Sequence, residues 1–328
     1  MSRESRGLGI LPWLVAGWLA ALLLAPLVGS HSLDPTAVFG GDATTATIFW
    51  QLRLPRVLLA LLAGGALSVA GLSYQTLFRN DLAEPYTLGV AVGAALGAVL
   101  AIRFGLQEVL GLPAVGAASF VGALAASSVV YGLAHRRRGG GGSTLLLAGI
   151  AVSLSATAVI LFVQYSSDST QTYRMVRWTM GGLAVVGYRE VLWLLPWVVA
   201  GCGLLVTLRR ELNLLLTGEE LAASRGVDLG RLQRWVLGGA SAMVGALVAV
   251  AGPIGFVGLM VPHILRRWVG HDHLRLIPAC WLAGGAFLVV CDTAARLVLA
   301  PAELPVGIVT ALLGGPFFLW LIFTDRGR

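Results

Sequence analysis

Ionisable side chains that could carry chemistry are rare inside the apolar stretches of this sequence. Asp292 and Arg296 are the pair that lies well within one of them, four residues apart. On a helix this spacing places both side chains on one face, so a simple ion pair is the first interpretation. Ion-gradient carriers usually bind and relay charge on acids or histidines inside the membrane. The sequence therefore argues against ion-coupled transport.

Histidines and cysteines could hold a metal, but their spacing does not favour it. His263 follows Pro262 at the end of a short apolar stretch, where a packed or capping histidine is the simpler interpretation. His271 and His273 flank Asp272, which leaves a metal pair or a structural turn open. The cysteines stand singly, without a CxxC motif: Cys202, Cys280 and Cys291. We expect neither a metal site nor a bound cofactor.

Nothing in the chain suggests catalysis. All 23 basic residues counted as Lys or Arg are Arg. A phosphate-binding P-loop needs a lysine, so ATP hydrolysis must occur in a different polypeptide. We also find no HExxH motif and no nucleophile–base pair. The sequence predicts a non-catalytic subunit.

Composition sets the class of protein. Apolar residues make up 57% of the 328 residues and charged residues only 12%, with a mean hydropathy of +0.83. A soluble domain carries about twice that charge fraction. The 43 glycines also suit helices that approach closely within a bilayer. We predict an all-α polytopic membrane protein forming one transmembrane domain over 1–328, with no role in nucleic-acid binding.

A bilayer core needs roughly 20 apolar residues per helix. Ten candidate spans meet or approach this length. They are 10–29, 54–77, 86–102, 112–134, 144–164, 191–208, 235–251, 254–265, 276–299 and 305–324. The eighth is too short to cross alone and should be a partial helix shielded by its neighbours.

The arginines predict the orientation of these spans. With the N-terminus inside, 16 of the 23 arginines fall on the inner side, which places both termini in the cytoplasm. The inner arginines are Arg3, Arg6, Arg79, Arg136, Arg137, Arg138, Arg209, Arg210, Arg225, Arg231, Arg234, Arg266, Arg267, Arg275, Arg326 and Arg328. The alternative is that the first span is a cleaved signal peptide ending near Ser30, which would invert the alternation.

The longest inner loop, 209–234, has the pattern of a structured segment. Glu219 and Glu220 stand at the start of a short helical stretch that Gly226 should end. Asp228 could cap a second short helix over 228–234. An ordinary solvated loop is the alternative.

Two of the spans share a weak sequence similarity. The stretch 65–71 resembles 245–252, and in the topology above these spans run in opposite directions. An inverted repeat would place them so. The similarity predicts a weak inverted repeat, although two helices rich in small residues can also match by chance.

Across nearly its whole length the chain resembles the FecCD-type permeases of ABC importers, which include cobalamin, haem and iron-siderophore permeases. The matching stretches are 53–56 (RLPR), 75–85 (QTLFRNDLAEP), 88–90, 145–149, 178–182, 252–259 (GPIGFVGL), 261–266 (VPHILR), 272–273, 303–310 (ELPVGIVT) and 314–318. One departure is Asp81, where the family more often has Pro. We expect it to change only the local turn.

The resemblance implies ten spans, a homodimer formed with a second copy, two ATP-binding subunits on the cytoplasmic face and one periplasmic substrate-binding protein. The family's ATPase-docking segment corresponds to Gly218, Glu219, Glu220, Leu221, Ala222, Ala223, Ser224, Arg225, Gly226 and Val227. The resemblance also implies that the 271–273 stretch is a structural turn and not a metal site.

The family's contacts with the binding protein correspond to Arg53, Arg56 and Arg296. Arginine suits this role because its planar guanidinium pairs with a carboxylate through two hydrogen bonds. Interfacial snorkelling is the alternative for Arg53 and Arg56, and the pair with Asp292 is the alternative for Arg296.

Together these observations predict a permease subunit of the bacterial inner membrane. It would import an iron chelate (haem or a ferric siderophore) or cobalamin by ATP-driven alternating access, through a largely uncharged path. An ion-coupled secondary transporter is the alternative, and it would require buried acids and no docking loop.

Overall fold

The computed structural model describes residues 3–29, 36, 38, 40, 42–86, 88–106, 108–109, 112–136 and 142–324. Helices form almost all of it, and a small hairpin pairs β1 (Glu108–Val109) with β2 (Leu112–Pro113). The all-α prediction is confirmed. Arg137, Arg138, Arg326 and Arg328, which carry part of the predicted inner charge, lie outside the described residues.

Each predicted span corresponds to one helix. In chain order they are α1 (Arg3–Leu24), α4 (Leu54–Phe78), α5 (Val90–Arg103), α6 (Ala114–Arg136), α7 (Gly142–Tyr165), α9 (Arg189–Thr207), α12 (Leu229–Ala251), α13 (Val257–Val269), α14 (His273–Leu297) and α15 (Val306–Thr324). Among the described residues, six helical stretches are long and apolar enough to cross a bilayer, and α1, α5 and α15 contain shorter apolar helices. The short eighth span is α13, with 13 residues.

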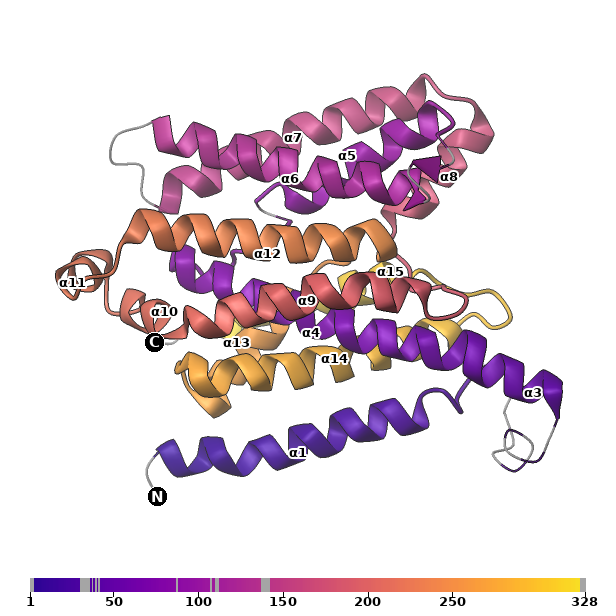
Figure 1. Cartoon of the computed structure of the whole chain (residues 1–328), viewed down its shortest axis with the longest axis horizontal. Helices are drawn as coiled ribbons and strands as arrows, with labels where there is room; N and C mark the ends of the chain where they lie inside the picture. The colour runs from indigo at the N-terminus through magenta and orange to yellow at the C-terminus, as the bar shows by residue number, and fades with distance from the viewer. Residues whose placement is uncertain are drawn as a thin grey trace.

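Helix α4 is the central element of the bundle. It continues from α3 (Ala43–Thr47) through a π-helical turn, η1 (Ile48–Arg53), and nearly all of its side chains are buried. It lies among α9, α12, α13 and α14 (Figure 1). A helix buried on all sides must be apolar all round, which explains why its sequence shows no polar face.

Small residues let the helices pack closely around α4. A methyl group on Gly71 would overlap the backbone of Gly258 in α13, and one on Gly64 would overlap that of Gly284 in α14. Backbone contact of this kind supplies the van der Waals packing that holds helices together in lipid.

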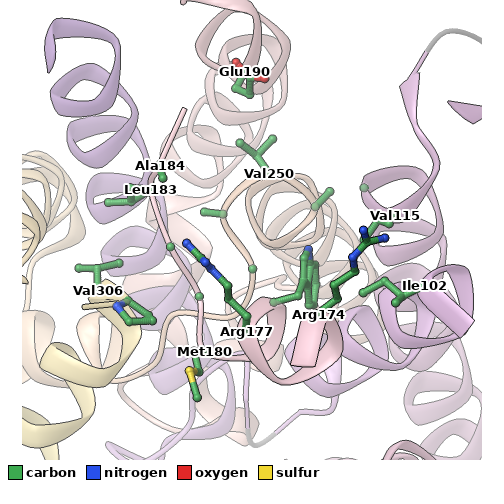
Figure 2. A pocket seen from close by; sticks show the side chains of 18 of the residues that line it. Ile102, Val115, Arg174, Arg177, Met180, Leu183, Ala184, Glu190, Val250 and Val306 are labelled. Atoms are coloured by element: carbon green, nitrogen blue, oxygen red, sulfur yellow. The ribbon is translucent and has the colours of Figure 1, made fainter. Parts of the chain in front are cut away.

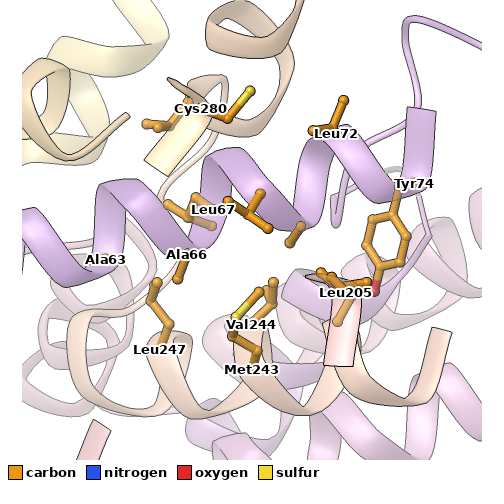
Figure 3. Close-up of a cluster of buried hydrophobic side chains, with 14 of the residues drawn as sticks. Ala63, Ala66, Leu67, Leu72, Tyr74, Leu205, Met243, Val244, Leu247 and Cys280 are labelled. Atoms are coloured by element: carbon orange, nitrogen blue, oxygen red, sulfur yellow. The ribbon is translucent and has the colours of Figure 1, made fainter. Parts of the chain in front are cut away.

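On its other side α4 packs against α12 and α9 through aliphatic side chains (Figure 3). Ala66, Leu67 and Leu247 belong to this cluster. The Tyr74 and Ser241 hydroxyl groups hydrogen-bond across the contact at 2.9 Å, so neither buried oxygen is left without a partner.

The remaining short helices mark the two ends of the bundle. At one end lie α3 and α8 (Ser169–Thr179), and at the other α10 (Arg209–Leu215) and α11 (Glu219–Ser224), as Figure 1 shows. The second end is the one to which the topology assigns most of the arginines.

Two local expectations were incomplete. The predicted short helix over 228–234 is the first part of α12 itself, because the Asp228 carboxylate caps that helix by accepting from Arg231 N–H at 2.9 Å. Helix α8 was not predicted, since its polar, short sequence resembles a loop. The two similar segments, 65–71 and 245–252, lie on α4 and at the end of α12. These helices run in opposite directions in Figure 1, and the inverted repeat itself stays a prediction.

Candidate functional site

Arg56 stands at the centre of a charged cluster where α4, α14 and the start of α15 meet. Its Nε and Nη2 donate to the two Asp292 carboxylate oxygens at 2.9 Å each, and its Nη1 donates to Glu303 at 2.6 Å. The Asp292 side chain is 1% exposed, whereas that of Glu303 is 49% exposed. The cluster therefore has a buried arm and an arm that reaches solvent.

Arg296 shares the buried carboxylate. Its Nε lies 3.3 Å from Asp292, as the i,i+4 spacing predicts. Its other nitrogens donate to Val28 O at 2.9 Å and Thr293 Oγ1 at 3.1 Å. One buried anion thus lies between two cations, and the second cation also ties α14 to the segment after α1.

Arg53 completes this end of the molecule. Its Nη1 donates to Pro26 O at 3.2 Å and Leu27 O at 3.1 Å. The structure therefore brings the three predicted docking arginines to one end of the bundle. Sequence reasoning identified the local pair of Asp292 with Arg296 and missed the closer pair with Arg56, whose partner is 236 residues away.

A pocket of about 1140 Å³ opens beside this cluster. Its walls come from α8, the start of α9, the turn 181–184, the end of α12 and residues 302–306. Arg56 and Glu303 line one part of it, and Arg174 and Arg177 of α8 line another. Figure 2 shows the guanidinium groups of Arg174 and Arg177 extending from α8 into the pocket.

A second pocket of about 480 Å³ lies next to the first, and Met180 lines both. Gly307 lines the second pocket and makes a close backbone contact, since a methyl group there would overlap the Met180 carbonyl. Glu84, from the turn after α4, lines the second pocket, and burial raises the pKa of its carboxyl group to about 7. The two pockets therefore adjoin at Met180.

The opposite end carries the segment 209–234. Helix α11 ends as predicted at Gly226, whose φ is +88°. Val227 N–H donates to Ala222 O at 3.1 Å and Gly226 N–H to Ala223 O at 2.9 Å, the two bonds of a Schellman cap. Ala222 and Val227 are buried, while Leu221 is 50% exposed. The segment is therefore an ordered helix and turn that leaves the apolar side chain of Leu221 half exposed.

A hydrogen-bond network fastens this segment to the core. The Asn213 side chain of α10 donates to Asp272 at 2.7 Å and accepts from His273 N–H at 3.0 Å. His273, which is buried, also contacts Thr76 of α4 at 2.9 Å. Although partial burial opposes it, hydrogen bonds from Asn213 and Leu274 N–H hold the pKa of Asp272 below its ordinary value. Movement of α10 would therefore be transmitted to α14 and α4.

The 271–273 stretch forms the turn that begins α14, with Asp272 as its N-cap. His263 packs against the rings of Phe317 and Phe318, with ring centroids 6.2 and 6.4 Å away. Asp81, the departure from the family motif, forms an ion pair with Arg266 of α13. Its effect extends from the local turn to the neighbouring helix.

Comparison with known proteins identifies this architecture. A family model described as the FecCD transport family matches residues 17–324. The chain belongs to the FecCD transport family. This FecCD chain is 39% identical to the hemin transport system permease protein HmuU of Yersinia pestis, over 96% of the chain and 97% of that protein.

Two further similarities concern vitamin B12 permeases. The FecCD chain is 44% identical to the cobalamin import system permease protein BtuC of Halobacterium salinarum, over 87% of the chain and 75% of that protein. It is 40% identical to the vitamin B12 import system permease protein BtuC of Escherichia coli, over 94% and 93%.

A solved structure described as an inward-facing conformation of a metal-chelate type ABC transporter superposes with a TM-score of 0.87. It is 30% identical and covers 96% of the FecCD chain and 99% of its own. The predictions of the family and of a polytopic permease fold are confirmed.

Proposed function

We propose that this FecCD chain is the non-catalytic, membrane-spanning subunit of an ABC importer that moves an iron chelate or cobalamin into the cytoplasm by alternating access. The observation that carries the proposal is the separation of two surfaces. A cluster of arginines beside a large pocket lies at one end of the bundle, and a capped segment bound to the core lies at the other. A subunit that couples an outer and an inner partner needs both.

At the outer end, Arg53, Arg56 and Arg296 would receive acidic residues of one periplasmic substrate-binding protein. Asp292 is deeply buried and remains with Arg56 and Arg296, whereas Glu303 is half exposed. A carboxylate of the binding protein could therefore take the place of Glu303 on Arg56. Because Glu303 lines the pocket, this exchange would link docking to the shape of the entrance.

At the inner end, the ten residues Gly218–Val227 within the loop 209–234 would receive one of two ATP-binding subunits. Leu221 and the exposed side chains around it offer the contact, while buried Ala222 and Val227 hold α11 in place. The bonds from Asn213 to Asp272 and His273 would carry a rigid-body movement into the bundle.

The chain would form a single domain and assemble with a second copy of itself in the bacterial inner membrane. Arginines favour the cytoplasmic side, which supports placing both termini and the segment 209–234 there. We expect this assembly to contain no nucleic acid.

One reconstitution tests the proposal. The chain is placed in proteoliposomes with its ATPase and binding-protein partners, with external haemin and with external cobalamin in parallel. We expect ATP-dependent uptake of one of them that is lost when the ATPase carries a Walker lysine substitution. Uptake that persists in that variant and follows a proton or sodium gradient would instead establish the ion-coupled alternative.

A further inference from the structure

Helix α8 places two arginines on one face. Arg174 and Arg177 are three residues apart, so their side chains lie next to each other on the helix surface. The opposite face is anchored, because Met175 is fully buried in a cluster that includes Val99 and Val163. The Asp168 carboxylate caps the start of the helix by accepting from Gln171 N–H at 2.9 Å. Helix α8 therefore holds Arg174 and Arg177 in a fixed position.

Neither guanidinium group is neutralised within the described part of the chain. No hydrogen bond or ion pair joins Arg174 or Arg177 to another described residue, and both side chains are exposed. Two acids line the same pocket: Glu303 is bound to Arg56, and Glu190 is joined to neither of the two arginines. Arginines that lack a counter-ion in a membrane protein face water-filled cavities, because contact with lipid is energetically costly for a charged side chain. Here they face the large pocket (Figure 2).

The pocket that they enter suits a bulky ligand with an apolar body. Its volume, about 1140 Å³, exceeds the usual range of about 300–1,000 Å³ for small-molecule sites. Trp178 and Trp193 contribute aromatic surface, and Val250 and Val306 contribute aliphatic surface. The lining thus combines broad apolar walls with the arginine pair of α8, and Arg56, Arg189, Glu190 and Glu303 supply its other charged groups.

We propose that Arg174 and Arg177 bind carboxylate groups on the transported molecule, so that the cargo is a metal chelate with a flat apolar body and at least two peripheral carboxylates. This inference rests on the proposed function and adds to it the chemical class of the cargo. Each guanidinium can donate two parallel hydrogen bonds to a carboxylate, and the walls remove the apolar body from water.

This chemistry distinguishes the two kinds of cargo that the relatives' names mention. Haem carries two carboxylates at the edge of a flat ring. The corrin ring of cobalamin carries neutral amides at its periphery, and the one anion of the molecule is a phosphodiester in its nucleotide loop, which would leave at least one arginine without a counter-charge. A site built for cobalamin gains nothing from a second, unpaired cation and must desolvate it on binding.

The test measures binding to the complete permease–ATPase complex in nanodiscs. Haemin is titrated by absorbance, and haemin dimethyl ester, which has the same ring without the charges, is titrated in parallel. We expect haemin to bind at least tenfold more tightly than the ester, with weaker haemin binding as salt rises. The double variant Arg174→Gln/Arg177→Gln should lose this preference, and Arg174→Lys/Arg177→Lys should recover part of it.

Arg103→Gln serves as the matched control, because Arg103 lies at the same end but does not line the pocket. Equal binding of haemin and its ester, or unchanged haemin binding by the double glutamine variant, would overturn the inference. So would a double variant that loses capture of the binding protein while binding haemin normally, since the arginines would then serve docking. ATPase copurification and ATP-driven uptake report on the proposed function independently, and they can succeed when this inference fails.

Discussion

Arg56 of α4 donates to both carboxylate oxygens of Asp292 of α14, which joins two helices far apart in sequence. Arg296 approaches the same carboxylate from within α14. A buried anion shared by two cations is stable only while it keeps its charge, because each partner was removed from water to make the contact.

Asp292→Asn should therefore strongly destabilise the protein. The substitution leaves Arg56 and Arg296 close together without their counter-ion, and loss of one partner of a buried pair costs about 3–5 kcal/mol. Unfolding of the purified protein in detergent, followed by temperature or denaturant, measures the change. Glu303→Gln is the control, since its exposed carboxylate should contribute less than about 1 kcal/mol. Equal losses for the two variants would contradict this account.

Glu303→Gln and Arg56→Glu should have different effects on docking. If a carboxylate of the binding protein takes the place of Glu303, removing the Glu303 charge frees Arg56 and should strengthen docking severalfold. Reversing the charge of Arg56 should weaken docking by at least tenfold. Capture of the permease complex on immobilised binding protein measures both, with ATPase copurification showing that each variant is assembled. Weaker docking of Glu303→Gln would show that Glu303 itself contacts the partner.

Leu221→Ser should weaken association with the ATPase subunit by about tenfold or more, because it removes the exposed apolar side chain of α11. Leu274→Ser is the matched control: Leu274 is 57% exposed at the same end but lies outside the segment 218–227. Copurification of the ATPase subunit with each variant gives the result. Equal retention of the ATPase by both variants would place the docking contact elsewhere.

The helices were predictable because a bilayer imposes long apolar stretches, and each of the ten proposed spans corresponds to a helix. Gly226 was readable as the end of α11 because a positive φ there favours glycine. These are local signals, since each depends on a few neighbouring residues or on one stretch of about twenty.

The charged cluster was only partly predictable. The four-residue spacing revealed Asp292 with Arg296, but the bonds from Arg56 to Asp292 and Glu303 join α4 to segments more than 200 residues away. No local pattern reports such a pairing. Helix α8 was missed for another reason: its anchor is the single residue Met175, while the arginines beside it resemble an exposed loop.

Gly71→Ala should destabilise the protein by about 1–3 kcal/mol, the range for overpacking a core. The new methyl group would overlap the backbone of Gly258, which cannot move without shifting α13 away from α4. Gly238→Ala is the matched control, because Gly238 is also in a helix but has open space around it. There the higher helix propensity of alanine should leave stability unchanged or slightly raised. Similar unfolding midpoints for the two variants would show that the contact is loose.

Burial of Glu84 should contribute a fall in stability as pH rises from about 4.5 to 7. Burial raises the pKa of its carboxyl group from 4.5 to about 7 in the folded protein, so between these values the folded state holds a proton that the unfolded state has released. Stability must then decrease with rising pH and level off above about pH 7. At about 1.4 kcal/mol per pKa unit, the whole change is about 3 kcal/mol. Histidines titrate over part of the same range, so the measurement is the difference between variants. Glu84→Gln should remove the Glu84 contribution from the dependence of the unfolding midpoint on pH, whereas Glu220→Gln, at an exposed position, should leave this dependence as in the native protein. A native profile that Glu84→Gln does not alter would mean that Glu84 is ionised in the folded protein and has a charged or water partner in the second pocket.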